Sequence, residues 1–378
     1  MKVVVAIDSL KGSLSSIEAG NAIRDGVKRA CTDAEVVVRP LADGGEGTTQ
    51  TLVSGLGGKI KKITVTGPQG TSVDAEYGII EETKTAIMEM ASAAGITLVA
   101  PEERNPLNTT TFGVGEMIAD AVKIGCRDFI IGIGGSATND GGMGMLSALG
   151  FGFFDKDDNN VEVFGRGLEK VARISTDNVM PELKECRFSI ACDVTNPLCG
   201  ENGCSSVYGP QKGATPEIVE KMDGWLQSYA ELAKNIFEKA DPQFPGAGAA
   251  GGLGFAFLTF LNGELEPGVD LILEKTKLRE YIKDADIVVT GEGRLDAQTA
   301  MGKAPIGVAK LAKKYGKMVI AFAGCVTKDA VKCNENGIDA FFPILREICT
   351  LEKAMEKDYA AESMAATVEQ VFRVVARK

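Results

Sequence analysis

MKVVVAIDSLKGS, residues 1–13, joins a short apolar run to a polar turn that contains glycine. Val3–Ile7 is rich in β-branched residues and ends at turn residues, which is typical of a buried parallel strand. Four more runs share this pattern: Glu35–Arg39, Ile287–Thr290, Val319–Phe322 and Ala340–Pro343. Helical apolar spacing occurs at Ser16–Ala30, Thr48–Leu56, Ala304–Tyr315 and Leu351–Val375. This alternation predicts a doubly wound parallel α/β sheet made from both ends of the chain.

The middle of the chain alternates apolar and polar residues instead. Three segments separated by turn sequences are typical of β-hairpins: Ile60–Thr66, Val73–Ile80 and Thr85–Met90. Further strands are expected at Phe129–Ile133 and Phe188–Cys192, with helices near Phe112–Lys123 and Pro216–Ala240. Together these segments predict a mixed sheet.

The chain has 378 residues, more than one hydrophobic core usually organises. We therefore predict two unlike α/β domains. Residues 1–60 and 284–378 form the doubly wound domain, and residues 61–283 form a mixed-sheet domain inserted into it. We expect the active site in a cleft between the two.

Composition excludes several classes of function. The formal net charge of -11 argues against a protein that wraps nucleic acid or docks on an anionic membrane. No apolar segment is long enough to span a membrane, and the N-terminal apolar run is too short for a secretory signal. Nine cysteines without a CxxC pair fit reduced thiols and a cytoplasmic location. The absence of histidine removes the Ser-His triad and every zinc site that contains histidine.

The polar residues follow strands, where open α/β sheets place their ligands. Lys11 lies in the turn after the first strand, which suits a phosphate or a carboxylate, although a solvated turn would look the same. Asp43 lies in Ala42–Thr48, a glycine-rich segment that can bind Mg²⁺, take a proton from a hydroxyl or simply begin a helix. Asp193 ends another apolar strand and suits a metal or a base, with a structural role equally open.

The densest loop is GIGGSATNDGG at residues 132–142. Its glycines and polar side chains predict a phosphate cradle made by Gly134, Gly135, Ser136, Thr138 and Asn139, with Asp140 as a metal ligand. Two basic residues elsewhere are suited to anions, Lys212 in a turn and Arg294 after a strand. Glu292 or Asp296, which lie on either side of Arg294, could bind metal or orient a hydroxyl.

Known nucleotide motifs are missing or out of place. No segment matches GxxxxGK[ST] or the protein-kinase combination of glycine-rich loop, HRD and DFG. GxGxxG occurs at Gly246–Gly251, but it follows a proline-rich segment instead of a strand. These glycines therefore serve either close packing or an anion at the next helix.

In order along the chain, AIDSLKGSLSS, PLADGGEGT, GIGGSATNDGG, ACDVTNPLCG, VYGPQKGA, PGAGAAGGLGFA, ELEPGVDL and TGEGRLDAQTAMGKAPIGVA resemble the type I glycerate kinase family. The resemblance covers nearly the whole chain. It implies transfer of phosphate from ATP to a hydroxyl of D-glycerate, giving 2-phosphoglycerate or 3-phosphoglycerate and ADP, and it implies that one domain is flavodoxin-like. Leu10 stands where the family's DSFKGS motif has Phe.

For this reaction we expect the 134–142 loop to contact ATP phosphates. Lys11, Lys212 and Arg294 would hold the anionic groups, and Asp140, Asp193 or Glu292 would bind Mg²⁺. Asp193 is the first choice of base and Asp43 the second. Two alternatives are a nicotinamide-dependent oxidoreductase of a small hydroxy-acid and a non-catalytic small-acid sensor. The phosphorylated hydroxyl and the oligomeric state stay open, with a homo-oligomer among the options.

Overall fold

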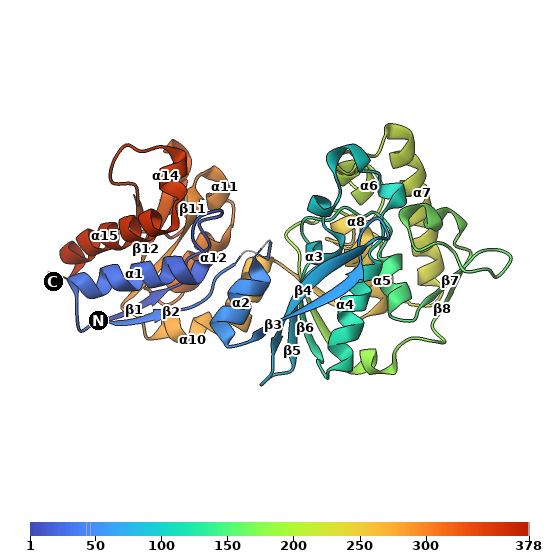
Figure 1. Ribbon diagram of the computed structural model, residues 1–378, viewed down its shortest axis with the longest axis horizontal. Coiled ribbons are helices and arrows are strands. Elements are labelled where there is room, and N and C mark those ends of the chain that lie inside the picture. Colours follow the sequence, from blue (N-terminus) through green and yellow to red (C-terminus); the bar gives the residue numbers. More distant parts are fainter. Residues whose placement is uncertain (43, 46, 377–378) are drawn as a thin grey trace. The chain divides into compact units, whose positions relative to one another are not determined.

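The computed structural model describes residues 1–42, 44–45 and 47–376, and its contacts divide the chain into two compact units (Figure 1). Unit 1 comprises Met1–Asp43, Gln50–Gly57 and Val269–Lys378. Unit 2 comprises Gly44–Thr49 and Gly58–Gly268. The predicted active site between two domains stays a prediction.

The sheet of unit 1 has five parallel strands: β1 (Lys2–Val5), β2 (Glu35–Val38), β11 (Ile287–Leu295), β12 (Met318–Val326) and β13 (Ala340–Pro343). Their order across the sheet is β13-β12-β11-β1-β2. Numbered within the unit, this is 2-1-3-4-5, the flavodoxin-like order. The predicted α/β fold class is confirmed.

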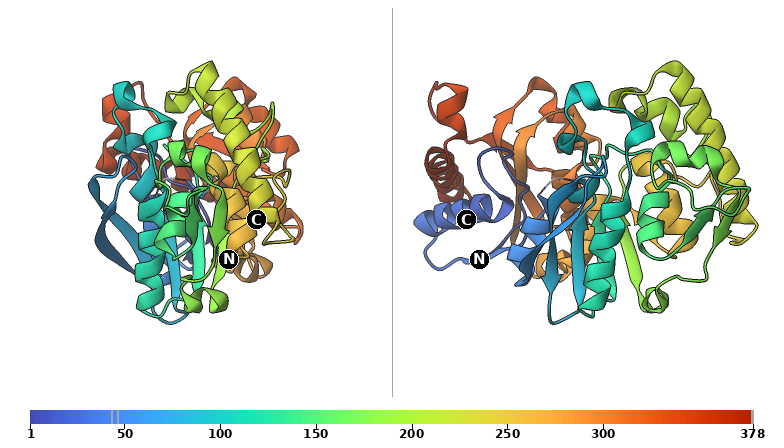
Figure 2. Two further views of the ribbon diagram at one scale, coloured as in Figure 1. Left: turned by 90° about the vertical axis from the view of Figure 1, so that its right-hand side faces the viewer. Right: turned by 45° about the vertical axis from the view of Figure 1, so that its right-hand side comes forward.

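Helices cover both faces of this sheet (Figures 1 and 2). Val3, Val5 and Ile7 share one face, where they pack with α1 (Ser16–Ala30) and α15 (Lys357–Val375) in one apolar core. The other helices of the unit are α2 (Thr48–Leu56), α9 (Gly268–Lys275), α10 (Leu278–Lys283), α11 (Ala297–Ala300), α12 (Ala304–Lys313), α13 (Lys332–Glu335) and α14 (Leu351–Met355).

Two details of unit 1 differ from the sequence-based expectation. The helix expected over Leu351–Val375 is two helices, because the backbone at Glu356 is extended (φ -61°, ψ 128°). The boundary expected at residue 284 lies at Val269, because α9 and α10 belong to this unit. Arg39, which follows β2, donates to the carbonyl of Thr276 at 2.7 Å and stacks over the ring of Tyr281.

Unit 2 contains a six-stranded mixed sheet in the order β10-β9-β6-β5-β4-β3. β3, β4 and β5 are antiparallel, and β5, β6, β9 and β10 are parallel. The strands are β3 (Lys59–Thr66), β4 (Ser72–Ile80), β5 (Thr85–Glu89), β6 (Asp128–Gly132), β9 (Arg187–Ala191) and β10 (Glu264–Glu266). The four parallel strands therefore end at one edge of the sheet, where glycine-rich and acidic segments follow them.

The helices of unit 2 are α3 (Ala91–Ala94), α4 (Phe112–Lys123), α5 (Met143–Ala148), α6 (Cys204–Tyr208), α7 (Pro216–Lys234) and α8 (Ala249–Phe260). A separate hairpin pairs β7 (Gly152–Phe154) with β8 (Arg173–Ser175). Short 3-10 helices across the chain lie at Ile96–Leu98, Pro101–Glu103, Pro106–Asn108, Gly165–Lys170, Pro181–Glu185, Pro210–Lys212 and Lys328–Val331. Within the residues that the structure describes, no helix has the length and apolarity needed to cross a membrane.

Candidate active site

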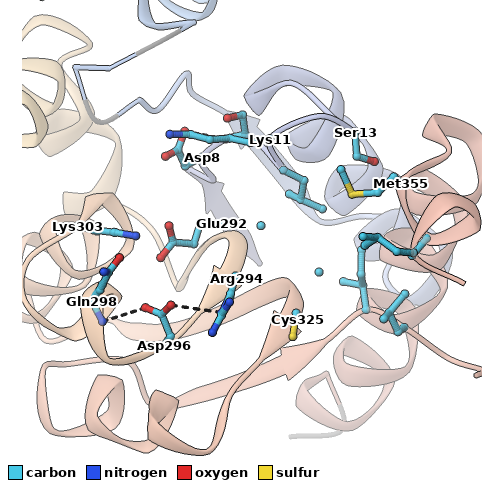
Figure 3. Close-up of a pocket in the computed structure, with 18 residues that line it drawn as sticks. Asp8, Lys11, Ser13, Glu292, Arg294, Asp296, Gln298, Lys303, Cys325 and Met355 are labelled. Atoms are coloured by element: carbon cyan, nitrogen blue, oxygen red, sulfur yellow. Dashed lines mark hydrogen bonds and ion pairs between the residues drawn. The ribbon is translucent and has the colours of Figure 1, made fainter. Parts of the chain in front are cut away.

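A hollow of about 500 Å³ lies at the carboxyl edge of the unit 1 sheet (Figure 3). The turn after β1 and the ends of β11 and β12 line it, together with α14 and the segment after β13. The strand order reverses between β1 and β11, and in open α/β sheets this reversal is where ligands bind. We call this hollow the β1–β11 pocket.

The turn after β1 has a defined local structure. Ser15 caps α1 in a capping box with Glu18, and Ser16 donates to the carbonyl of Ile7 at 2.7 Å. Asp8 is buried, and its carboxylate accepts the Ser9 amide at 2.7 Å. Lys11 is exposed at the tip of the turn. The turn thus brings a carboxylate and an ammonium to the pocket.

The end of β11 supplies the opposite wall. Glu292 is buried, and its carboxylate accepts the hydroxyl of Thr299. Asp296 caps α11 by accepting the amides of Gln298 at 2.9 Å and Thr299 at 3.2 Å. Partial burial raises the pKa of Asp296, but the hydrogen bonds from these amides together lower it by more. Its pKa therefore lies below the usual value. Arg294 lies 3.3 Å from Asp296 and is largely exposed.

Charges of both signs therefore face one hollow. Figure 3 shows Asp8, Lys11 and Glu292 grouped around it, with Lys303 from the start of α12 on the same side. Cations can hold phosphate or carboxylate groups, and the carboxylates can bind a metal ion or orient a hydroxyl. The arrangement suits an anionic substrate that arrives with a divalent cation.

In unit 2, a buried lysine side chain forms hydrogen bonds to the 134–142 loop. Lys212 is 3% exposed, and its ammonium donates to the hydroxyl of Ser136 at 2.8 Å and to the carbonyl of Thr138 at 2.6 Å. Burial lowers the pKa of Lys212 to about 8. This geometry assigns Lys212 to holding the loop, and contact with phosphate stays a prediction.

Asp140 is completely buried in the same loop. Its oxygens accept the amide and hydroxyl of Thr111, both at 2.7 Å, and the amides of Gly142 and Gly144 at 3.1 and 3.2 Å. Burial raises the pKa of Asp140, and these hydrogen bonds offset only part of that effect. We do not propose Asp140 as a metal ligand, because four protein donors already form hydrogen bonds to its carboxylate.

The other polar side chains of the loop also point inward. Thr138 and Asn139 are buried, and the Asn139 amide donates to the hydroxyl of Ser205 at 2.9 Å. Gly134 and Gly135 are exposed, so the loop presents glycine backbone to solvent. The Gly246–Gly251 motif serves packing, because a Cβ at Gly251 would lie 2.1 Å from the carbonyl oxygen of Thr138.

Asp193 is exposed after β9 and accepts the amide of Gly268 at 2.8 Å. Glu89, at the end of β5, accepts the amides of Gly47 and Thr49 at 3.2 and 2.8 Å. The second predicted base, Asp43, lies outside the described residues. The described residues contain no group of three or more Cys, Asp or Glu that could hold a metal ion by themselves.

The structure brings together three of the predicted site residues, Lys11, Glu292 and Arg294, in the β1–β11 pocket. The remaining described ones lie in unit 2: Gly134, Gly135, Ser136, Thr138, Asn139, Asp140, Asp193 and Lys212. Sequence reasoning gave no role to Asp8 and Lys303, although Asp8 is the first polar residue after the first strand. It also missed the apolar side of the pocket, most of whose residues follow β13 and carry no motif: Ile344, Leu345, Leu351 and Met355.

Comparison with known proteins gives concordant matches. The model of the "Glycerate kinase family" matches residues 3–376. A glycerate kinase from Haemophilus influenzae is 46% identical over 378 residues, with all of both chains covered. A glycerate 2-kinase from Escherichia coli K12 is 45% identical over 97% of this chain and 98% of its own.

A solved structure agrees. The crystal structure of a candidate glycerate kinase 2 from Salmonella typhimurium LT2 matches with a TM-score of 0.92 at 44% identity. The match covers 100% of this chain and 98% of that chain. Sequence and fold therefore point to the same relatives.

Proposed function

Because the chain belongs to the glycerate kinase family, we propose that it transfers the γ-phosphoryl group of ATP to the 2-hydroxyl of D-glycerate, with Mg²⁺. The family and its named relatives make the chain an enzyme that phosphorylates glycerate. The choice of the 2-hydroxyl rests on the Escherichia coli relative, which is named a glycerate 2-kinase. The match sets aside the oxidoreductase and sensor alternatives.

The observation that carries the proposal is the charge pattern of the β1–β11 pocket. Lys11, Arg294 and Lys303 provide cations, and Asp8 and Glu292 provide carboxylates, at the point where the strand order reverses. Phosphoryl transfer depends mainly on positioning and on neutralising charge over the phosphoryl oxygens. The pocket supplies cations that can neutralise phosphoryl oxygens and carboxylates that can position a metal ion or a hydroxyl, and it does so without a Walker motif.

The proposed step moves one phosphoryl group from one oxygen atom to another. The glycerate hydroxyl oxygen forms a bond to the γ-phosphorus while the bond from that phosphorus to the β–γ bridging oxygen breaks. ADP leaves with the bond's electron pair, and the hydroxyl proton passes to a carboxylate base. Asp193, the first-choice base, is exposed and its carboxylate accepts the Gly268 amide, but it lies in unit 2 and does not line this pocket, so its role as the base stays a prediction.

The residues present fit Mg²⁺ of the kind found in kinases. Such an ion keeps several waters and takes one or two carboxylates together with substrate phosphates. Asp8 and Glu292 face the pocket from adjacent strands and would hold the ion. When bound, Mg²⁺ neutralises phosphate charge. The family's type I subdivision, a cytoplasmic location and the oligomeric state stay predictions.

Phosphorus NMR of the products tests the proposal. The protein is incubated with Mg-ATP and D-glycerate, with L-glycerate and a Glu292→Gln variant as controls. We expect ADP and 2-phosphoglycerate in equal amounts from D-glycerate only. 3-Phosphoglycerate as the product would overturn the choice of hydroxyl. An unchanged ATP spectrum after incubation with correctly folded protein would overturn the proposed function.

A further inference from the structure

The β1–β11 pocket has two chemically different sides. Figure 3 shows Asp8, Glu292 and Lys303 on one side and Cys325 and Met355 on the other. The second side is completed by Leu10, Ile344, Leu345 and Leu351. A hollow that is charged at one end and apolar at the other matches a ligand with an anionic and an apolar part.

The apolar side is unusual because much of it is exposed. Leu345, Leu351 and Met355 are 40%, 77% and 36% exposed. Clustered exposed apolar side chains beside a pocket mark a binding surface. Met355 is seated on the turn after β1, since a Cβ at Gly12 would lie 2.8 Å from its terminal methyl carbon. The apolar side thus borders the turn that carries Lys11.

A buried hydroxyl adds an independent observation. Ser13 lines the pocket and is 7% exposed, and its oxygen has no hydrogen-bond partner among the described residues. A buried polar group without a partner is costly unless a ligand or water completes it. Figure 3 shows Ser13 beside Met355, on the apolar side.

D-Glycerate cannot use these features. It is a three-carbon acid with a carboxylate and two hydroxyls, so it has no apolar surface to cover leucine and methionine side chains. A nucleoside has a flat base with apolar faces and polar nitrogen atoms on its edges, and a ribose that carries hydroxyl groups. Its attached phosphates would lie toward the cations.

We propose that the apolar side of the β1–β11 pocket binds the base and ribose of the phosphoryl donor, so that this pocket is the nucleotide site. This inference rests on the proposed function for the identity of the nucleotide. It differs from the sequence-based expectation that the 134–142 loop provides the contacts to ATP.

The test measures binding of MgADP and of magnesium pyrophosphate by isothermal titration calorimetry. Leu351→Ser removes an exposed apolar side chain from the pocket. Ile348→Ser, the matched control, removes a fully exposed one that does not line it. We expect Leu351→Ser to weaken MgADP binding at least about tenfold, since burying a leucine side chain contributes that much. Pyrophosphate binding, and both ligands in the control, should be unchanged.

Kinetics separate failure of this inference from failure of the function. We expect Leu351→Ser to raise KM for ATP and leave KM for D-glycerate unchanged. Unchanged MgADP affinity with a raised KM for D-glycerate would overturn the inference and leave the kinase function intact. Wild-type protein that binds MgADP as expected but never phosphorylates glycerate would overturn the function instead. Should Leu351→Ser fail to fold, Leu345→Ser provides the same comparison.

Discussion

Gly291 connects the packing of the unit 1 sheet to the site, and we expect its replacement by alanine to damage both. Its φ of 149° lies in a region that residues with side chains rarely adopt. An added Cβ would lie 1.8 Å from the carbonyl oxygen of Phe322 on β12, whereas real Cβ contacts stay above 3.0 Å. The two strands must therefore separate by at least about 1.2 Å at this point.

The cost can be estimated from two contributions. The unfavourable φ costs about 1–3 kcal/mol. Separating β11 from β12 weakens their hydrogen bonds and packing, which adds roughly 2 kcal/mol. We expect Gly291→Ala to lower the free energy of unfolding by about 3–5 kcal/mol, measured by urea denaturation. The kcat should fall as well, because Glu292 is the next residue and moves with the strand.

Gly302→Ala is the matched control. Gly302 also has a positive φ, 122°, but an added Cβ would meet no atom within 4 Å. This variant should therefore lose only the backbone contribution. Equal losses in the two variants would refute the reasoning, because they would show that the clash with Phe322 contributes nothing.

Two further predictions concern unit 2. Asp193→Asn should lower kcat by roughly 100-fold without changing the urea midpoint, because asparagine keeps an acceptor for the Gly268 amide but is no base; unchanged turnover would exclude Asp193. Because burial depresses the pKa of Lys212 to about 8, the unfolded chain binds more protons than the folded one between about pH 8 and 10.5. The free energy of unfolding of the wild type should therefore rise across this window relative to that of Lys212→Met. If the two proteins show parallel profiles of unfolding free energy against pH, the burial of this ammonium is contradicted.

Much of the fold could be predicted from the sequence because local patterns decide it. The buried strands of unit 1 are short β-branched runs, and the Ser15 capping box marks the start of α1. Features without a local signal were missed. β10 is only three residues long, and the break between α14 and α15 falls at Glu356, which neither proline nor glycine marks.

Some residues of the candidate pocket could be predicted for a related reason. Lys11 and Glu292 could be found because they lie near the carboxyl ends of strands: Lys11 follows β1, and Glu292 follows the predicted strand Ile287–Thr290, although β11 extends past it to Leu295. Which way a loop side chain faces is decided by tertiary packing. Thr138, Asn139 and Asp140 have the residue types of a ligand cradle, yet their side chains are buried within unit 2. Residue type and spacing alone cannot distinguish these two orientations.

The most direct measurement for the β1–β11 pocket is the effect of Lys11→Met on turnover and on stability. Lys11 is exposed and lines the pocket, so the change should reduce kcat/KM at least about 100-fold while the urea midpoint stays within error of wild type. Lys314→Met, an exposed residue outside the pocket, should change neither quantity. Full activity in Lys11→Met, or a loss of activity matched by an equal loss of stability, would contradict the assignment of phosphoryl transfer to this pocket.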